Sequence, residues 1–222
     1  MRSFWARLAI TWKKKRPARG DIGPRSGAPG HYSLFPRRLH ALCYFVPITI
    51  QLPDLKSQTN FNVARWSELV ADPELARLPN RIETDRHGHI IMSPPPAARH
   101  SRRQARIAAL LERLLPDGTP FTECAISTAD GVKATDVAWL RQQRSEIDEE
   151  PVLFTRAPEI CVEILSPSNT PAEIDEKRVL YFDAGATEVW ICKLDGSITF
   201  FLDPDRQAST SGLCPAFPDR IP

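Results

Sequence analysis

The chain has 222 residues, of which 42% are hydrophobic and 25% are charged, and its formal net charge is +2 at pH 7. This composition is that of an ordinary globular protein with enough residues for one domain and a proper core. The longest apolar stretch, residues 41–50, is too short to span a bilayer and contains a proline, so we expect no membrane protein and a cytoplasmic location.

The cysteines exclude two classes of small, cross-linked protein. Five of them lie far apart in the sequence, and no CxxC pair occurs. An odd number without close pairs indicates neither a disulfide framework nor a structural zinc site. We therefore expect reduced thiols packed in the core.

Charge is distributed unevenly along the chain. Residues 1–58 hold eleven Lys and Arg against two acidic residues, whereas the remaining residues hold 18 basic and 25 acidic ones. The first segment is rich in Lys, Arg, Pro and Gly and has no sustained apolar period, so we predict a disordered basic tail over 1–58. It is either an arm that grips phosphates or a solvated extension. A domain over 59–205 and a C-terminal tail over 206–222 complete the predicted organisation.

Regular structure is predicted from residue 59 onwards. Apolar residues at helical spacing indicate a helix over 62–72, and two short runs around a glycine-containing turn indicate a hairpin over 81–92. A long helix is predicted from Ala98 to Leu115, after the stiff sequence SPPP. Five β-like runs follow, with another helix between the third and the fourth: 121–128, 132–140, 159–165, 187–192 and 197–202. This order predicts an α/β or α+β domain with a mixed sheet.

Two of these runs carry a carboxylate on a face that is otherwise apolar or small. Because side chains alternate along a strand, Asp136 lies between two alanines on its face, and Glu163 lies between Cys161 and Leu165. Burying an ionised carboxylate without a partner costs roughly several kcal/mol. Either the acids lie on a solvated face of the sheet, or they hold a divalent ion together, since Mg²⁺ accepts oxygen ligands on a rigid scaffold.

The helix after Glu163 has clear boundaries in the sequence. Thr170 is expected as the N-cap, with Pro171 at the first helical position and Glu173 three residues after the cap, which is the pattern of a capping box. Gly185 is typical of a C-terminal stop.

On this helix, Lys177 shares a face with Ile174 and Tyr181, which should point towards the sheet. A lysine on an inward face needs a reason. Its side chain either snorkels to solvent or supplies a positive charge beside a metal-bound phosphate.

Three blocks occur in a specific order: RIETDRHGHIIMSPPPAARH at 81–100, GVKATDVAWL at 131–140, and APEICVEILSPSNTPAEIDEKRVLYFDAGATEVWIC at 157–192. With them, the segment from about Phe61 to Leu202 resembles the Uma-two family of restriction-endonuclease-like proteins, within the PD-(D/E)XK superfamily. The resemblance implies a mixed central sheet flanked by helices. It also implies a metal-dependent endonuclease that uses Mg²⁺ or Mn²⁺ to hydrolyse phosphodiester bonds of nucleic acid, in the first place DNA.

The resemblance implies site residues as well. The family's aspartate falls on Asp136 and its glutamate on Glu163, both as metal ligands, and its lysine falls on Lys177, displaced from the strand to the following helix. Glu83 matches an earlier family acid, and His100 matches a histidine that opens the long helix. We therefore take these five residues as the candidate catalytic set.

The chain departs from the strict superfamily motif at two positions. Leu165 stands where a lysine is expected, and Thr135 stands where a proline precedes the aspartate. The resemblance implies that Lys177, on the following helix, replaces the lysine missing at position 165. The second departure is expected to be harmless, because the carboxylate of the next residue carries the chemistry.

The long helix presents two different faces. His100 lies on its apolar stripe, as either a satisfied core histidine or a participant in metal or phosphate chemistry. The other face is an arginine ridge, which either tracks a nucleic-acid backbone or is simply solvated. The ridge consists of Arg99, Arg102, Arg103, Arg106 and Arg113.

The alternative function is a non-cleaving nucleic-acid-binding or oligomerising module that kept the nuclease fold. Acyl transfer and nucleotide-cofactor chemistry are not indicated, because the sequence lacks GxSxG, GxGxxG and Walker A patterns. A homodimer is expected, because two-fold dimers are the commonest assembly and suit a duplex.

Overall fold

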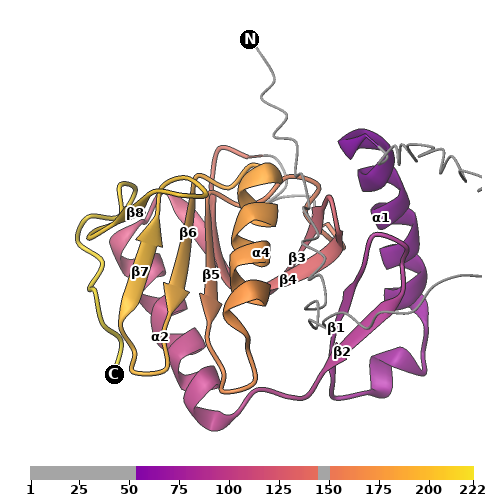
Figure 1. The fold of residues 1–222 in the computed structure, drawn as a ribbon, viewed down its shortest axis with the longest axis horizontal. Helices are drawn as coiled ribbons and strands as arrows, with labels where there is room; N and C mark the ends of the chain where they lie inside the picture. Colours follow the sequence, from indigo (N-terminus) through magenta and orange to yellow (C-terminus); the bar gives the residue numbers. More distant parts are fainter. Residues whose placement is uncertain (1–53, 145–150) are drawn as a thin grey trace, which may run out of the picture. The chain divides into compact units, whose positions relative to one another are not determined.

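The computed structural model describes residues 54–144 and 151–222 (Figure 1). Its elements, in chain order, are α1 (Leu55–Ala71), η1 (Leu75–Arg77), β1 (Arg81–Thr84), β2 (Ile90–Ser93), α2 (Ala98–Leu114), β3 (Gly118–Thr128), β4 (Gly131–Arg141), β5 (Ile160–Ile164), α4 (Pro171–Asp183), β6 (Glu188–Cys192), β7 (Ile198–Phe201) and β8 (Gln207–Ala208). Helices and strands occur in the predicted order. None of the helices in this described part is long and apolar enough to cross a membrane.

The domain starts earlier than predicted. Most of the predicted basic tail lies outside the described residues, but α1 begins at Leu55, inside the range assigned to that tail. Asp54 caps the helix, because its carboxylate accepts a hydrogen bond of 3.0 Å from the Ser57 amide. Sequence analysis missed this helix start because the first turn is polar and adds little to the periodic pattern of apolar residues.

Six strands form one mixed sheet in the order β3-β4-β5-β6-β7-β8 (Figure 1). Strands β5 and β6 run parallel, and the other neighbours in this sheet run antiparallel. Parallel neighbours need a crossover connection, and α4 supplies it. The predicted α/β architecture with a mixed central sheet is therefore confirmed.

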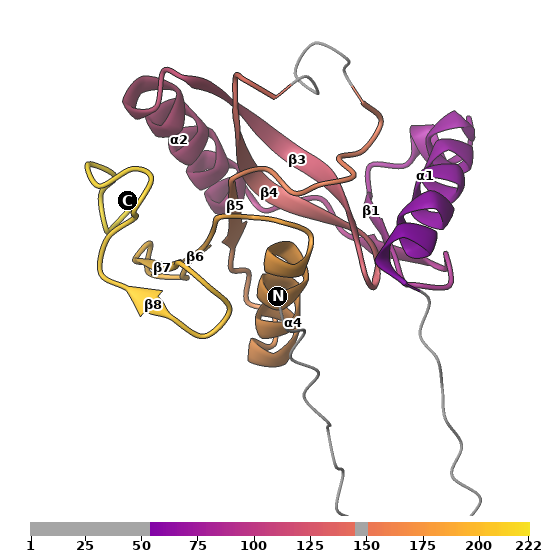
Figure 2. The same ribbon diagram turned by 90° about the horizontal axis from the view of Figure 1, so that it is seen from above.

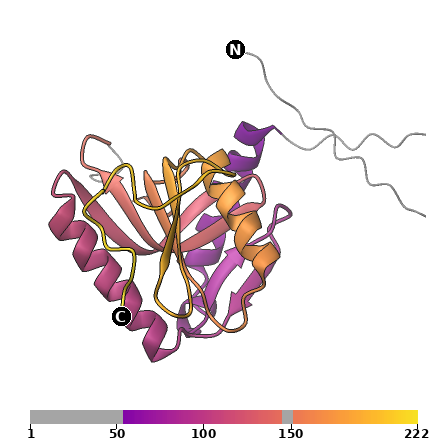
Figure 3. The same cartoon turned by 60° about the vertical axis from the view of Figure 1, so that its left-hand side comes forward.

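Helices α2 and α4 cover opposite faces of this sheet (Figures 2 and 3). On the α2 face, Ile107 and Leu111 pack into a core that includes Trp139. On the α4 face, Tyr181 packs with Ala138. Adjacent residues of β4 thus point to opposite cores, as their alternation predicts.

Local sequence explains where α4 begins and ends. The Thr170 hydroxyl accepts a hydrogen bond from the Glu173 amide, and the Glu173 carboxylate accepts one from the Thr170 amide, at 3.3 Å and 2.9 Å. Gly185 follows the helix with a φ of 105°, which a glycine adopts without strain. The predicted capping box and C-terminal stop are confirmed.

The β1–β2 hairpin docks on the start of β4. The Val132 amide donates to the Thr84 hydroxyl at 2.9 Å, and the Ala134 amide donates to Glu83 at 3.0 Å. Gly131 permits this approach, because a Cβ at that position would meet the backbone of the hairpin. The docking brings Glu83 beside β4.

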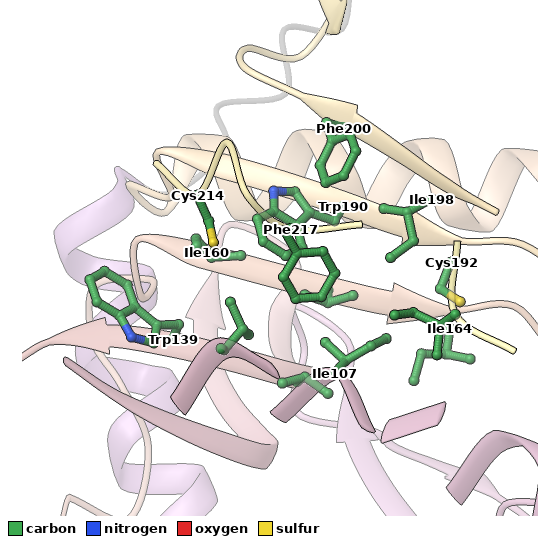
Figure 4. Packing of buried hydrophobic residues seen from close by; sticks show 14 residues of the cluster. Ile107, Trp139, Ile160, Ile164, Trp190, Cys192, Ile198, Phe200, Cys214 and Phe217 are labelled. Carbon is green, nitrogen blue, oxygen red and sulfur yellow. The ribbon is translucent and has the colours of Figure 1, made fainter. Parts of the chain in front are cut away.

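Residues 206–222 belong to the folded domain, which corrects their assignment to a tail. Phe217 and Ile221 are buried in the core on the α2 face. The centroids of the Phe217 and Trp190 rings are 4.6 Å apart, and both rings lie in this core (Figure 4). Buried Glu188 accepts hydrogen bonds from a side chain and a backbone amide of this segment. The segment has little regular structure, so its apolar residues show no period that sequence analysis can detect.

We expect Ile221→Ala to lower the free energy of unfolding by at least about 2 kcal/mol, because it removes buried apolar atoms and leaves a cavity. The exposed neighbour Asp219 serves as a control, and Asp219→Ala should change the same quantity by no more than about 0.5 kcal/mol. Urea denaturation measures both. Equal small effects would show that the segment does not contribute to the cooperative core.

Candidate active site

Adjacent strands β4 and β5 place two carboxylates beside each other. The antiparallel pairing of β4 with β5 ends at Val137 and Val162, and Asp136 and Glu163 are the next residues on the two strands. Because Asp136 is 1% exposed and Glu163 is 4% exposed, the alternative of a solvated sheet face is wrong.

Three groups hold Asp136. Its Oδ1 accepts a hydrogen bond from Arg81 at 2.5 Å, and its Oδ2 accepts one from the Ile164 amide at 2.6 Å and lies 3.2 Å from His100 Nε2. Burial acts to raise the pKa of Asp136, but the hydrogen bond with His100 and the charge of Arg81 outweigh it and lower that pKa. Asp136 is therefore ionised at neutral pH.

Glu163 is less completely neutralised. Its Oε1 accepts a hydrogen bond of 2.6 Å from the Tyr181 hydroxyl, and its Oε2 lies 3.5 Å from Lys177 Nζ. Burial raises the pKa of Glu163 to about 7, against the opposing charge of Lys177 and with the support of the negative charge of Asp136. A further cation beside Glu163 would favour its ionised form.

Lys177 reaches these carboxylates from α4. Its Nζ donates a hydrogen bond of 2.7 Å to Glu83 and lies near Glu163, and its side chain is 19% exposed. Burial acts to lower the pKa of Lys177, but Glu163 and Glu83 outweigh it and raise that pKa. The lysine is therefore charged and directed at the carboxylates, so the snorkelling alternative is wrong.

Arg81 is a site residue that sequence analysis missed. Besides Asp136, its guanidinium contacts Glu83 at 3.0 Å and Glu123 at 3.6 Å. The sequence RIET indicated that Arg81 and Glu83 lie together, because side-chain alternation puts both on one face of a short strand. The distance along the chain between Arg81 and Asp136 concealed the contact.

His100 joins the same group from the first turn of α2. The hydrogen bond with Asp136 raises the pKa of His100, although burial opposes this. Its Nδ1 is buried and has no hydrogen-bond partner among the described residues. The histidine therefore contacts the same carboxylate as Arg81 does.

The arginines of the ridge on α2 differ in their surroundings, and Arg103 does not lie on an exposed face as predicted. Arg103 is buried and donates to two backbone carbonyls of the turn after β6. Arg106 donates to a backbone carbonyl of the C-terminal segment at 2.9 Å. Both contacts join α2 to segments far along the chain, although Arg106 is itself exposed, as are Arg99 and Arg102.

A cavity of about 750 Å³ opens at this group of residues. Its lining includes Asp136, Glu163, Lys177, His100 and Arg99. A volume of this size is typical of small-molecule sites. The candidate catalytic residues therefore share one solvent-accessible space.

The charged residues at this cavity carry an excess of negative charge. Four carboxylates and two permanent cations form what we call the carboxylate cluster: Glu83, Glu123, Asp136, Glu163, Arg81 and Lys177. With every carboxylate ionised, the excess equals the charge of one divalent cation. Among residues 54–144 and 151–222, no group of three or more His, Cys, Asp or Glu side chains is arranged to hold a metal alone. Mg²⁺ does not require one, because it binds through one or two carboxylates and keeps several waters.

We expect Glu163→Gln to be more stable than the wild type at pH 8, by at most about 3 kcal/mol. The folded pKa of about 7 lies above the ordinary 4.5, so Glu163 costs stability progressively as pH rises through that window. The difference should therefore vanish towards pH 5. Asp136→Asn provides a control of opposite sign, because the pKa of Asp136 is lowered by folding and its carboxylate stabilises the protein at pH 8. Urea denaturation at both pH values distinguishes these effects, and a Glu163→Gln difference independent of pH would contradict them.

Residues 72–213 match the model of the Uma2 family, which is described as "Putative restriction endonuclease". No curated protein matches the chain. A solved structure from Anabaena variabilis, titled "a putative nuclease belonging to DUF820", is similar with a TM-score of 0.54 and 18% sequence identity, over 68% of this chain and 92% of that one. At this identity the likeness establishes the fold, whereas the family match spans more than half of the chain. The chain therefore belongs to the Uma2 restriction-endonuclease family, the Uma-two family of the sequence analysis, and has a nuclease fold.

Proposed function

We propose that this protein is a metal-dependent endonuclease that hydrolyses phosphodiester bonds, with DNA as its substrate. The observation that carries the proposal is the convergence of Asp136, Glu163 and Lys177 on one cavity. Membership of a family described as restriction endonucleases supports nuclease chemistry. The family description names neither a metal nor DNA, so both are part of this proposal. The homodimer and the cytoplasmic location stay predictions.

Asp136 and Glu163 are the residues that would hold Mg²⁺ or Mn²⁺. Both carboxylates are fixed by strands and by hydrogen bonds, and Asp136 Oδ1 and the two Glu163 oxygens each keep a lone pair for a further ligand. When bound, the metal supplies an activated water and polarises a phosphoryl oxygen. The raised pKa of Glu163 fits this role, since the metal's charge would compensate the burial that raises it.

Lys177 is proposed to act on the phosphate or on the attacking water. Lys177 lines the cavity, where a positive charge would stabilise the negative charge that develops on phosphoryl oxygens. Glu83 holds the ammonium group in place at 2.7 Å. His100 keeps Asp136 oriented from the other side.

Arg99 and Arg102 are the proposed contacts to the nucleic-acid backbone. Both are exposed on the first turns of α2, and Arg99 lines the cavity. Phosphate contacts of this kind position a nucleic acid without reading its sequence.

A non-cleaving binding module is the second candidate, and one contact favours it. The Arg81–Asp136 ion pair already compensates a carboxylate that the metal would use. A protein that had lost its metal could keep its site folded by such a pair.

A nuclease assay separates the two functions. Duplex DNA, single-stranded DNA and RNA are incubated with the protein in Mg²⁺, Mn²⁺ or EDTA. We expect cleavage of DNA that stops in EDTA and is absent in Asp136→Asn. Binding without cleavage on every substrate would favour the module instead.

A further inference from the structure

Arg81 is the cation best placed to compete with a metal for Asp136. Its Nη1 lies 2.5 Å from Asp136 Oδ1, and its side chain is 19% exposed. The buried carboxylate therefore already has a charged partner within the protein. A divalent ion on the same carboxylate would face both a bound partner and a repelling charge within a few ångströms, where low polarity strengthens the repulsion.

The surroundings of Arg81 allow it to change partners. Its Nη2 lies 3.0 Å from Glu83 and its Nε lies 3.6 Å from Glu123, so two other carboxylates neutralise the guanidinium. Releasing Asp136 would not leave a buried cation unpaired, which would be strongly unfavourable. The fork of an arginine can hold several carboxylates at once, which a lysine cannot do with the same geometry.

We infer that Arg81 is a positioning residue that neutralises Asp136 in the metal-free protein and is displaced from it by the incoming divalent cation. This inference rests on the metal site of the proposed function. Arg81 therefore lowers the affinity of the site for metal, and it keeps the metal-free site folded. After displacement, the guanidinium remains on Glu83 and Glu123 at the wall of the cavity.

The test measures Mn²⁺ binding by calorimetry on the full chain. Arg81→Gln should bind Mn²⁺ about tenfold more tightly than the wild type, because it removes the positive charge that competes for Asp136, and a factor of this size is usual for two coupled binding interactions. The same variant should melt at a lower temperature without metal, because Asp136 and Glu83 lose a counter-charge. Saturating Mn²⁺ should reduce this difference in melting temperature. A purely structural arginine would lower the melting temperature without strengthening metal binding.

Two variants serve as controls. Arg86 forms a comparable ion pair of 2.9 Å with Asp130, outside the carboxylate cluster, so Arg86→Gln should leave Mn²⁺ affinity unchanged. Arg81→Lys keeps one charge without the fork and should bind Mn²⁺ with an affinity between those of the wild type and Arg81→Gln. Arg81→Lys also provides the measurement if Arg81→Gln fails to fold.

Equal or weaker Mn²⁺ binding by both Arg81 variants would overturn the inference, as would the absence of Mn²⁺ binding in the wild type. Tighter binding by the variants supports it, whether or not the wild type cleaves. If the variants bind Mn²⁺ more tightly but the wild type cuts no nucleic acid, the inference stands and the proposed endonuclease function fails.

Discussion

The variant that combines Asp136→Asn with Glu163→Gln is expected to bind no Mn²⁺ in calorimetry and to cleave no nucleic acid. Both changes replace a charged oxygen donor by a neutral amide, whereas divalent cations such as Mg²⁺ depend on carboxylates in sites with few protein ligands. The two carboxylates come from adjacent strands, β4 and β5, and line the same cavity, where one ion could contact both.

The variant should remain folded, because the two changes have opposite effects on stability. Asp136→Asn removes a stabilising charge, and Glu163→Gln removes a buried carboxylate whose pKa is raised to about 7. Asp130→Asn is the matched control, since Asp130 lines the same cavity but pairs with Arg86 and Lys133. Mn²⁺ binding by the double variant equal to that of the wild type would place the metal elsewhere.

Lys177→Ala is expected to reduce cleavage by about 10² to 10³, which is the usual cost of losing one group that stabilises developing charge. Mn²⁺ binding should survive, because the carboxylates hold the ion. The neighbouring Arg178 is a suitable control, because it carries the same charge on the same helix but pairs with Asp175 and stacks on Phe201. Arg178→Ala should leave cleavage close to that of the wild type.

Lys177→Ala also separates three roles of the lysine. Loss of cleavage with intact metal binding indicates action on the water or phosphate. In a binding module, the wild type does not cleave and the change at most weakens nucleic-acid affinity. A structural lysine would shift only the melting temperature. Normal cleavage by Lys177→Ala, of a substrate that Asp136→Asn cannot cut, would mean that another cation acts on the phosphate.

Sequence alone identified the residues that depend on local geometry. Alternation along β4 and β5 put Asp136 and Glu163 on inward faces, and both side chains are buried. Helical spacing put Lys177 on the face of α4 that meets the sheet, and its Nζ reaches Glu83 and Glu163. These features follow from periods of two and 3.6 residues, which operate within a few residues of the chain.

The roles of the arginines were decided by tertiary structure. Nothing near Arg81 in the sequence indicates Asp136, which lies 55 residues away, because their contact depends on how the β1–β2 hairpin docks at Gly131. Arg103 shared the polar face of its helix with exposed arginines, yet the turn after β6 folds over it and supplies two carbonyl acceptors.

The sequence by itself determined the mixed sheet, the limits of α4 and the inward direction of Asp136, Glu163 and Lys177, because capping and side-chain alternation are local properties. Tertiary structure alone decided which cations neutralise those carboxylates and that residues 206–222 complete the core. Such contacts join segments far apart in the chain, and charge pairing or burial between them leaves no periodic pattern in either segment.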